Sequence, residues 1–214
     1  MAGHGAEADE VLAALSSTDP ALRRAALGAA TRLGVLPTDR LLAFFADPDP
    51  AVAQRAVTLA GRLPADAPDR PEVARRLAAL LGGPLGEAAA FSLGELEWAD
   101  DAIVAALGEQ GREAEDPLVR ESAIAALGVL GRGRATVLAA MADVATVRRR
   151  AAIAMANFDG PEVDAALTAA LDDRDWQVRQ VAEDLLGPPP DDLIDDDADE
   201  HGSGPDAVED RDGP

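Results

Sequence analysis

Few side chains in this sequence have the chemistry that catalysis requires. The two histidines, His4 and His201, lie in the terminal segments, and the chain has no cysteine and no tyrosine. Serine needs a neighbouring base to become a nucleophile, and His and Cys are the side chains that most often complete a metal site. We therefore predict no catalytic residue, no metal site and no cofactor.

Among the polar side chains, arginine recurs in a regular pattern, at the same position of a repeated segment. The recurring residues are Arg23, Arg120, Arg148 and Arg179. Such a column could form a ligand-binding ladder. It could also link adjacent repeats, each arginine pairing with a turn aspartate such as Asp19, Asp116 or Asp175. Recurrence at the same position of each repeat favours the second interpretation.

The run Arg148–Arg150 needs a separate explanation. Three successive helical residues point about 100° apart, so they cannot all join one column. At least one of them faces solvent or a partner. We favour a solvated face, and keep the run as a candidate contact for an acidic segment.

The arginines belong to short amphipathic segments, of which Asp116–Gly131 (DPLVRESAIAALGVLG) is the clearest. Asp-Pro is typical of a helix start, and glycine of a helix end. Between them, Val119, Ala123, Ile124 and Leu127 follow the spacing of one face of a helix. The segment predicts one helix that needs neighbours to cover its apolar face.

Five further segments repeat this pattern. We call the first apolar residue of each segment its anchor; the anchors are Leu22, Val52, Leu85, Val119, Val147 and Val178. They are spaced by 30, 33, 34, 28 and 31 residues. Each anchored segment follows another helical stretch; these stretches are roughly Ala6–Leu15, Thr38–Ala46, Pro71–Leu81, Asp100–Leu107, Arg134–Met141 and Pro161–Leu171. A period of this length predicts a helical solenoid.

The form D-P-x-V-R-x-x-A-x-x-A-L-G-x-L at Asp116–Leu130 resembles a HEAT repeat, of the short type found in phycobilisome (PBS) lyase HEAT-like proteins. The resemblance covers about residues 6–187. It implies an all-α, armadillo-like, right-handed superhelix of about six helix-turn-helix repeats. The second repeat has Ala53 and the third has Gly86 in place of the arginine, and the fifth opens with Ala145-Thr146 in place of Asp-Pro. We expect these units to be locally irregular.

Deoxyhypusine hydroxylases resemble the same repeat pattern and hold two irons with His-Glu pairs. Those pairs are absent from the repeats of this sequence, so we do not expect that activity.

Composition divides the chain into three parts: a flexible N-terminus (1–5), the repeat array (6–187) and an acidic tail (188–214). The tail holds nine Asp, two Glu and one Arg, and we expect it to be disordered. The formal net charge of the whole chain is −21, which argues against nucleic acid and anionic membranes as partners. No apolar run approaches the ~20 residues of a membrane span, and no signal peptide is visible. We expect a cytoplasmic monomer.

These observations predict a non-catalytic scaffold that binds a protein or peptide along its concave face. The second helix of each repeat lines that face in HEAT arrays, and residues two and six positions after each anchor point outward from it. The candidate partner-binding residues are Arg24, Gln54, Thr58, Glu87, Phe91, Glu121, Arg149 and Ile153. The alternative is a PBS lyase-like accessory enzyme, a lyase or isomerase that handles a tetrapyrrole or similar chromophore.

Overall fold

The computed structural model describes residues 2–187, with side chains from residue 5, and every regular element in this range is a helix. The first helices of the six repeats are α1 (Ala2–Ala14), α3 (Thr38–Ala43), α5 (Arg70–Ala78), α7 (Asp101–Glu113), α9 (Arg134–Ala139) and α11 (Pro161–Ala170). The second helices are α2 (Pro20–Arg32), α4 (Pro50–Ala60), α6 (Gly86–Leu96), α8 (Pro117–Leu130), α10 (Ala145–Met155) and α12 (Trp176–Leu186). Short 3-10 helices, η1 (Phe44–Ala46) and η2 (Ala140–Ala142), extend α3 and α9. The predicted all-α solenoid of helix pairs is confirmed.

Aspartate side chains start most of the second helices. Asp116 accepts a hydrogen bond from the amide of Leu118 at 2.9 Å, and Pro117 occupies the first helical turn. Asp19, Asp49 and Asp175 cap α2, α4 and α12 in the same way. The second helices without this cap are α6 and α10, whose N-cap residues are Leu85 and Val144 in place of aspartate.

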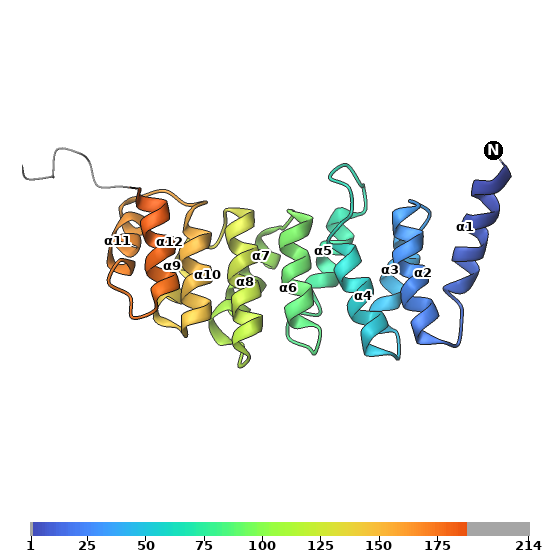
Figure 1. The fold of residues 1–214 in the computed structure, drawn as a ribbon, viewed down its shortest axis with the longest axis horizontal. Coiled ribbons are helices and arrows are strands. Elements are labelled where there is room, and N and C mark those ends of the chain that lie inside the picture. The colour runs from blue at the N-terminus through green and yellow to red at the C-terminus, as the bar shows by residue number, and fades with distance from the viewer. Residues whose placement is uncertain (1, 188–214) are drawn as a thin grey trace, which may run out of the picture.

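The repeats stack side by side along the long axis of the molecule (Figure 1). Each second helix packs on the second helix of the next repeat, from α2 through to α12. The second helices contact one another more extensively than the first helices do. They therefore form the denser of the two layers.

Small residues allow this close stacking. Gly61, Gly94 and Gly128 stand nine residues after their anchors and face the residue seven after the next anchor. A Cβ built on Gly128 would lie 2.6 Å from the Cβ of Ala154, which is closer than two carbons can approach. Because both positions are small, α8 and α10 approach nearly to backbone contact.

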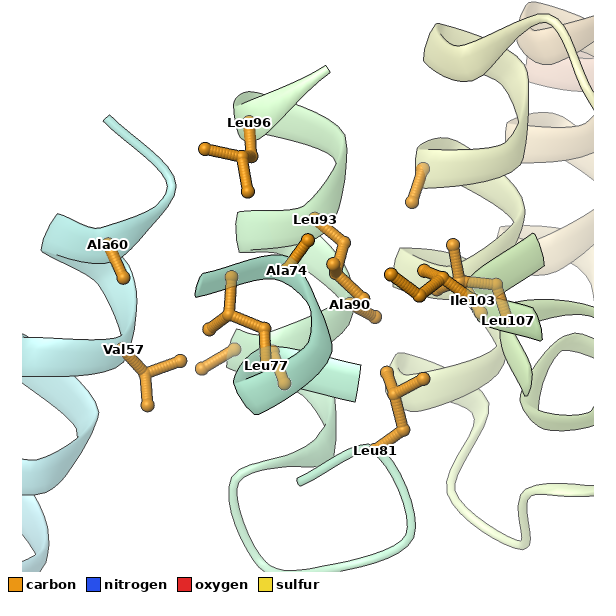
Figure 2. Close-up of a cluster of buried hydrophobic side chains, with 14 of the residues drawn as sticks. Val57, Ala60, Ala74, Leu77, Leu81, Ala90, Leu93, Leu96, Ile103 and Leu107 are labelled. Atoms are coloured by element: carbon orange, nitrogen blue, oxygen red, sulfur yellow. The ribbon is translucent and has the colours of Figure 1, made fainter. Parts of the chain in front are cut away.

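One thin apolar core runs through most of the array. Its central part includes Val57 of α4, Leu77 of α5, Leu93 of α6 and Leu107 of α7 (Figure 2). The last repeat has a separate small cluster of its own, made of Ala170, Val178 and Ala182 with Met141 and Leu171 beside it.

The anchors are not equally buried. Val52, Val147 and Val178 are fully buried, Leu85 and Val119 are partly buried, and Leu22 is 47% exposed. The sequence pattern places all six on the apolar face, but the neighbours that cover that face differ between repeats.

The largest differences between the predicted and the observed helix boundaries are at two helices. Helix α1 begins at Ala2, four residues before the expected start of the array, and α7 continues to Glu113, beyond the expected Leu107. The expected disordered tail, residues 188–214, lies outside the described residues. Within residues 2–187 no helix is long and apolar enough to cross a membrane.

Candidate functional site

Three members of the arginine column link adjacent repeats, and the fourth, Arg179 in the last repeat, donates to the carbonyl oxygen of Asp173 in its own repeat. Arg120 of α8 donates to Asp143 through Nε and Nη2, both at 2.7 Å. Its Nη1 donates to the carbonyl oxygen of Ala114, in the turn of its own repeat, also at 2.7 Å. Arg23 and Arg148 make the same two kinds of contact, with Asp47 and Asp173 as their ion-pair partners. Each of these guanidinium groups ties one repeat to the turn of the next.

The aspartates in these pairs are not those that the sequence suggested. Asp19, Asp116 and Asp175 use their carboxylates to cap the helix of their own repeat, and none of them forms an ion pair with an arginine of the column. The acceptors are Asp47, Asp143 and Asp173, each in the turn of the following repeat. The hydrogen bonds from the arginine side chains hold the pKa of all three carboxyls below their usual value.

The two repeats without the arginine also lack its acceptor. Ala53 and Gly86 replace the arginine in the second and third repeats, and the turn positions that correspond to the acceptor aspartate are Leu80 and Ala114. Both partners are therefore replaced together, and the middle of the array is joined by apolar packing without these ion pairs.

Three of the predicted partner-binding residues lie together. Arg24 of α2 and Gln54 and Thr58 of α4 line one open groove of about 620 Å³ between the two helices. We call it the α2–α4 groove. Gln54 also lines a second groove, of about 380 Å³, with Glu87 at the start of α6.

Two predicted apolar residues are exposed further along the array. Phe91 on α6 is 47% exposed and Ile153 on α10 is 42% exposed, while Ala125 on α8 between them is partly buried. Solvent-facing side chains of this size are available for contact with a partner.

The remaining two predicted residues take part in contacts between repeats. Glu121 of α8 accepts a hydrogen bond from Arg150 of α10 at 3.0 Å, and Arg149 of α10 donates to Gln177 of α12 at 3.0 Å. Arg148, the first residue of the run, is 4% exposed and paired with Asp173. Arg148 is therefore not part of a solvated face, whereas Arg149 and Arg150 are partly exposed and each also contacts a neighbouring repeat.

The sequence analysis missed two charged members of the α2–α4 groove, Arg32 and Arg55. They stand ten and three positions after their anchors, whereas only positions two and six were counted. At 100° per residue all four positions fall within a 100° arc of the helix. A complete helical wheel would have included both arginines.

In the part of the chain that the structure describes, no cluster of three or more His, Cys, Asp or Glu side chains could hold a metal ion. His4 lies in α1, outside the residues with described side chains, and His201 lies in the tail.

Residues 104–187 match the family model of HEAT repeats, so the chain is similar to HEAT repeats over that range. No curated protein sequence matches the chain. A structure of the CpcE–CpcF complex of phycocyanin lyase from Nostoc is similar at 24% identity and a TM-score of 0.58, over 84% of this chain and 75% of that one.

A designed armadillo repeat protein is similar at 15% identity and a TM-score of 0.56, over 83% of this chain and 97% of that one. A structure of the Kap95–Nup1 complex is similar at 16% identity and a TM-score of 0.57, over 82% of this chain and 29% of that one. At these identities the likeness shows the fold, an armadillo- or HEAT-like helical solenoid.

Proposed function

We propose that this HEAT-repeat solenoid is a non-catalytic module that binds a protein or peptide along the layer formed by its second helices. The observation that carries the proposal is the α2–α4 groove, which opens on the same layer as the exposed side chains of Phe91 and Ile153. A polar groove continued by scattered apolar side chains suits an extended peptide or a helix with one apolar edge.

The packing of the two layers supports this choice of face. Helices on the inner side of a curved array are closer together than those on its outer side, because they lie on a shorter arc. The second helices form the denser layer, and the contact between Gly128 and Ala154 shows how near they come. We infer that they line the concave side, which is the surface that solenoids commonly use for binding.

Two structures with this fold hold protein partners. One is a complex of Kap95 with Nup1, and the other is a complex of CpcE with CpcF. For this chain they support only the idea that such a solenoid can receive a polypeptide. We propose further that the protein acts as a cytoplasmic monomer.

Affinity capture from the native cell, followed by mass spectrometry, tests the function. Phe91→Ala and Ile153→Ser should weaken capture of the partner, and Arg149→Glu should abolish it, while the melting temperature changes little. Arg76→Glu is the matched charge control, because Arg76 is exposed on the first helix α5, away from the proposed face.

Two results would contradict the proposal. If capture survives all three changes, the partner site lies elsewhere. A visible absorbance band in protein purified from the native source, with no co-purifying polypeptide, would support the chromophore lyase or isomerase in its place.

A further inference from the structure

Three arginines converge in the α2–α4 groove. Arg24 and Arg32 come from α2 and Arg55 from α4, and the other lining residues are Ala21, Ala25, Gly28, Ala51, Gln54 and Thr58. A Cβ built on Gly28 would lie 3.0 Å from Nη2 of Arg55 and 3.4 Å from Nη1 of Arg32. The absence of a side chain at Gly28 therefore leaves room for two guanidinium groups to meet.

These cations have no counter-charge in the groove. None of the lining residues is acidic, and none of the three arginines has an ion pair or a hydrogen bond with another described residue. Asp49 lies beside Arg24 at one edge, but its carboxylate accepts the amides of Ala51 and Val52 as the cap of α4.

Elsewhere in the array, the side chains at the repeat positions of Arg24 and Arg55 form an ion pair. Arg55 and Arg150 both stand three residues after their anchors, and Arg150 pairs with Glu121, which stands two residues after its own anchor, in the preceding repeat. In the first repeat, the residue two positions after the anchor is Arg24. Arg24 and Arg55, which repel each other, thus take the place of an attractive pair such as Glu121 and Arg150. This occurs in a chain whose formal net charge is −21.

An anionic ligand would remove this repulsion. The planar guanidinium group binds carboxylates through two parallel hydrogen bonds, and three such groups can hold several carboxylates in a row. A groove of about 620 Å³ that is open to solvent has room for a short stretch of peptide.

We propose that the α2–α4 groove is a binding site for a carboxylate-rich peptide segment, and that its occupant in the free protein is residues 188–214 of this chain. Those residues hold nine Asp and two Glu against one Arg. The longest cationic run of the sequence, Arg148–Arg150, is already engaged within the array.

The tail is long enough to reach the groove. Its 27 residues span at most roughly 90 Å when extended. Four helix-to-helix steps separate α12 from α4, which at 8–10 Å each is roughly 40 Å. Because Arg24, Gln54 and Thr58 also belong to the proposed partner face, a partner would have to displace the tail.

The experiment places a nitroxide on the tail of the full-length chain. The chain has no cysteine, so Ser203→Cys gives one labelling position. We expect paramagnetic broadening of the amide signals of Ala25, Gly28 and Gln54. Raising the salt concentration from about 0.1 M to about 1 M shortens the Debye length from roughly 10 Å to roughly 3 Å, and this should remove the broadening.

Arg24→Glu provides the decisive variant, because it recreates the Glu121–Arg150 arrangement and should neutralise Arg55 without unfolding the protein. Broadening should disappear in Arg24→Glu and persist in Arg76→Glu, which makes the same change of charge on α5. Thermal unfolding of both variants confirms that they remain folded.

Three results would overturn the proposal: no selective broadening in α2 and α4, broadening that survives Arg24→Glu, or broadening that requires the label to be on a second molecule. The last result would assign the groove to another copy of the chain. None of these measurements uses the unidentified partner, so they leave the proposed function to its own test.

Discussion

Arg148 and Asp173 join the fifth and sixth repeats through two parallel hydrogen bonds, from Nε to Oδ2 at 2.8 Å and from Nη2 to Oδ1 at 2.7 Å. Their side chains are 5% and 13% exposed. Since the last repeat has its own small apolar cluster, this pair is a main polar link between that repeat and the rest of the array.

Asp173→Asn should loosen the last repeat selectively. The change leaves the Arg148 guanidinium without its counter-charge in a mostly buried place, which costs about 2–4 kcal/mol of the free energy of unfolding. Hydrogen exchange should accelerate in α12 and stay unchanged in α6. Asp172→Asn, one residue earlier and exposed, is the control and should have little effect. Equal exchange in the two variants would contradict the role of the pair.

Acid should weaken the same links. The pKa of Asp143 is lowered in the folded state, chiefly by the hydrogen bond from Arg120, so the pair stabilises the fold above the unfolded-state pKa of about 3.9. That contribution is lost as the pH falls through the folded-state pKa. Denaturant unfolding should therefore show wild type more stable than Asp143→Asn at pH 6, with the difference shrinking below about pH 4. A difference that stays constant to pH 2 would contradict this assignment.

Gly128→Ala should destabilise the array although alanine favours helices. The added methyl would meet the Cβ of Ala154 at 2.6 Å, and overpacking of this kind costs about 1–3 kcal/mol. Ala154→Gly should recover part of the loss, which a double-mutant cycle measures. Gly82→Ala is the control, because a Cβ there meets nothing within 4 Å. Independent effects of the two changes would argue against direct contact.

Ser92→Ala should leave stability unchanged or raise it by about 1 kcal/mol. The side chain is fully buried in α6, and its hydroxyl has no hydrogen-bond partner among the described residues. Removing an unsatisfied buried hydroxyl relieves its desolvation cost. A clear drop in the chemical-denaturation midpoint would show that the hydroxyl does have a partner.

The anchors should differ in their tolerance of charge. Val147→Asp places an unpaired carboxylate where the side chain is fully buried and should cost more than about 3 kcal/mol. Val119→Asp should cost less, because Val119 is partly exposed. Thermal melts of the two variants give the order, and the reverse order would contradict the observed burial.

The sequence by itself determined the repeats and most helix boundaries. The 3.6-residue spacing, the Asp-Pro starts and the closing glycine at Gly131 act within a few residues of each other, so they can be recognised without knowledge of the neighbours. For this reason the expected helix at Thr38–Ala46 agrees with α3 followed by η1. The outward positions of Phe91 and Ile153 also follow from the helical period alone.

Only the tertiary structure determined which charged side chains form ion pairs. Asp19 and Asp47 both lie in turns near Arg23, and the stacking of the second repeat on the first selects Asp47 while Asp19 caps its own helix. The α2–α4 groove likewise depends on two helices brought together across Gly28. Ion pairs and grooves between repeats depend on the offset and rotation of one repeat against the next, and packing over the whole interface sets that geometry.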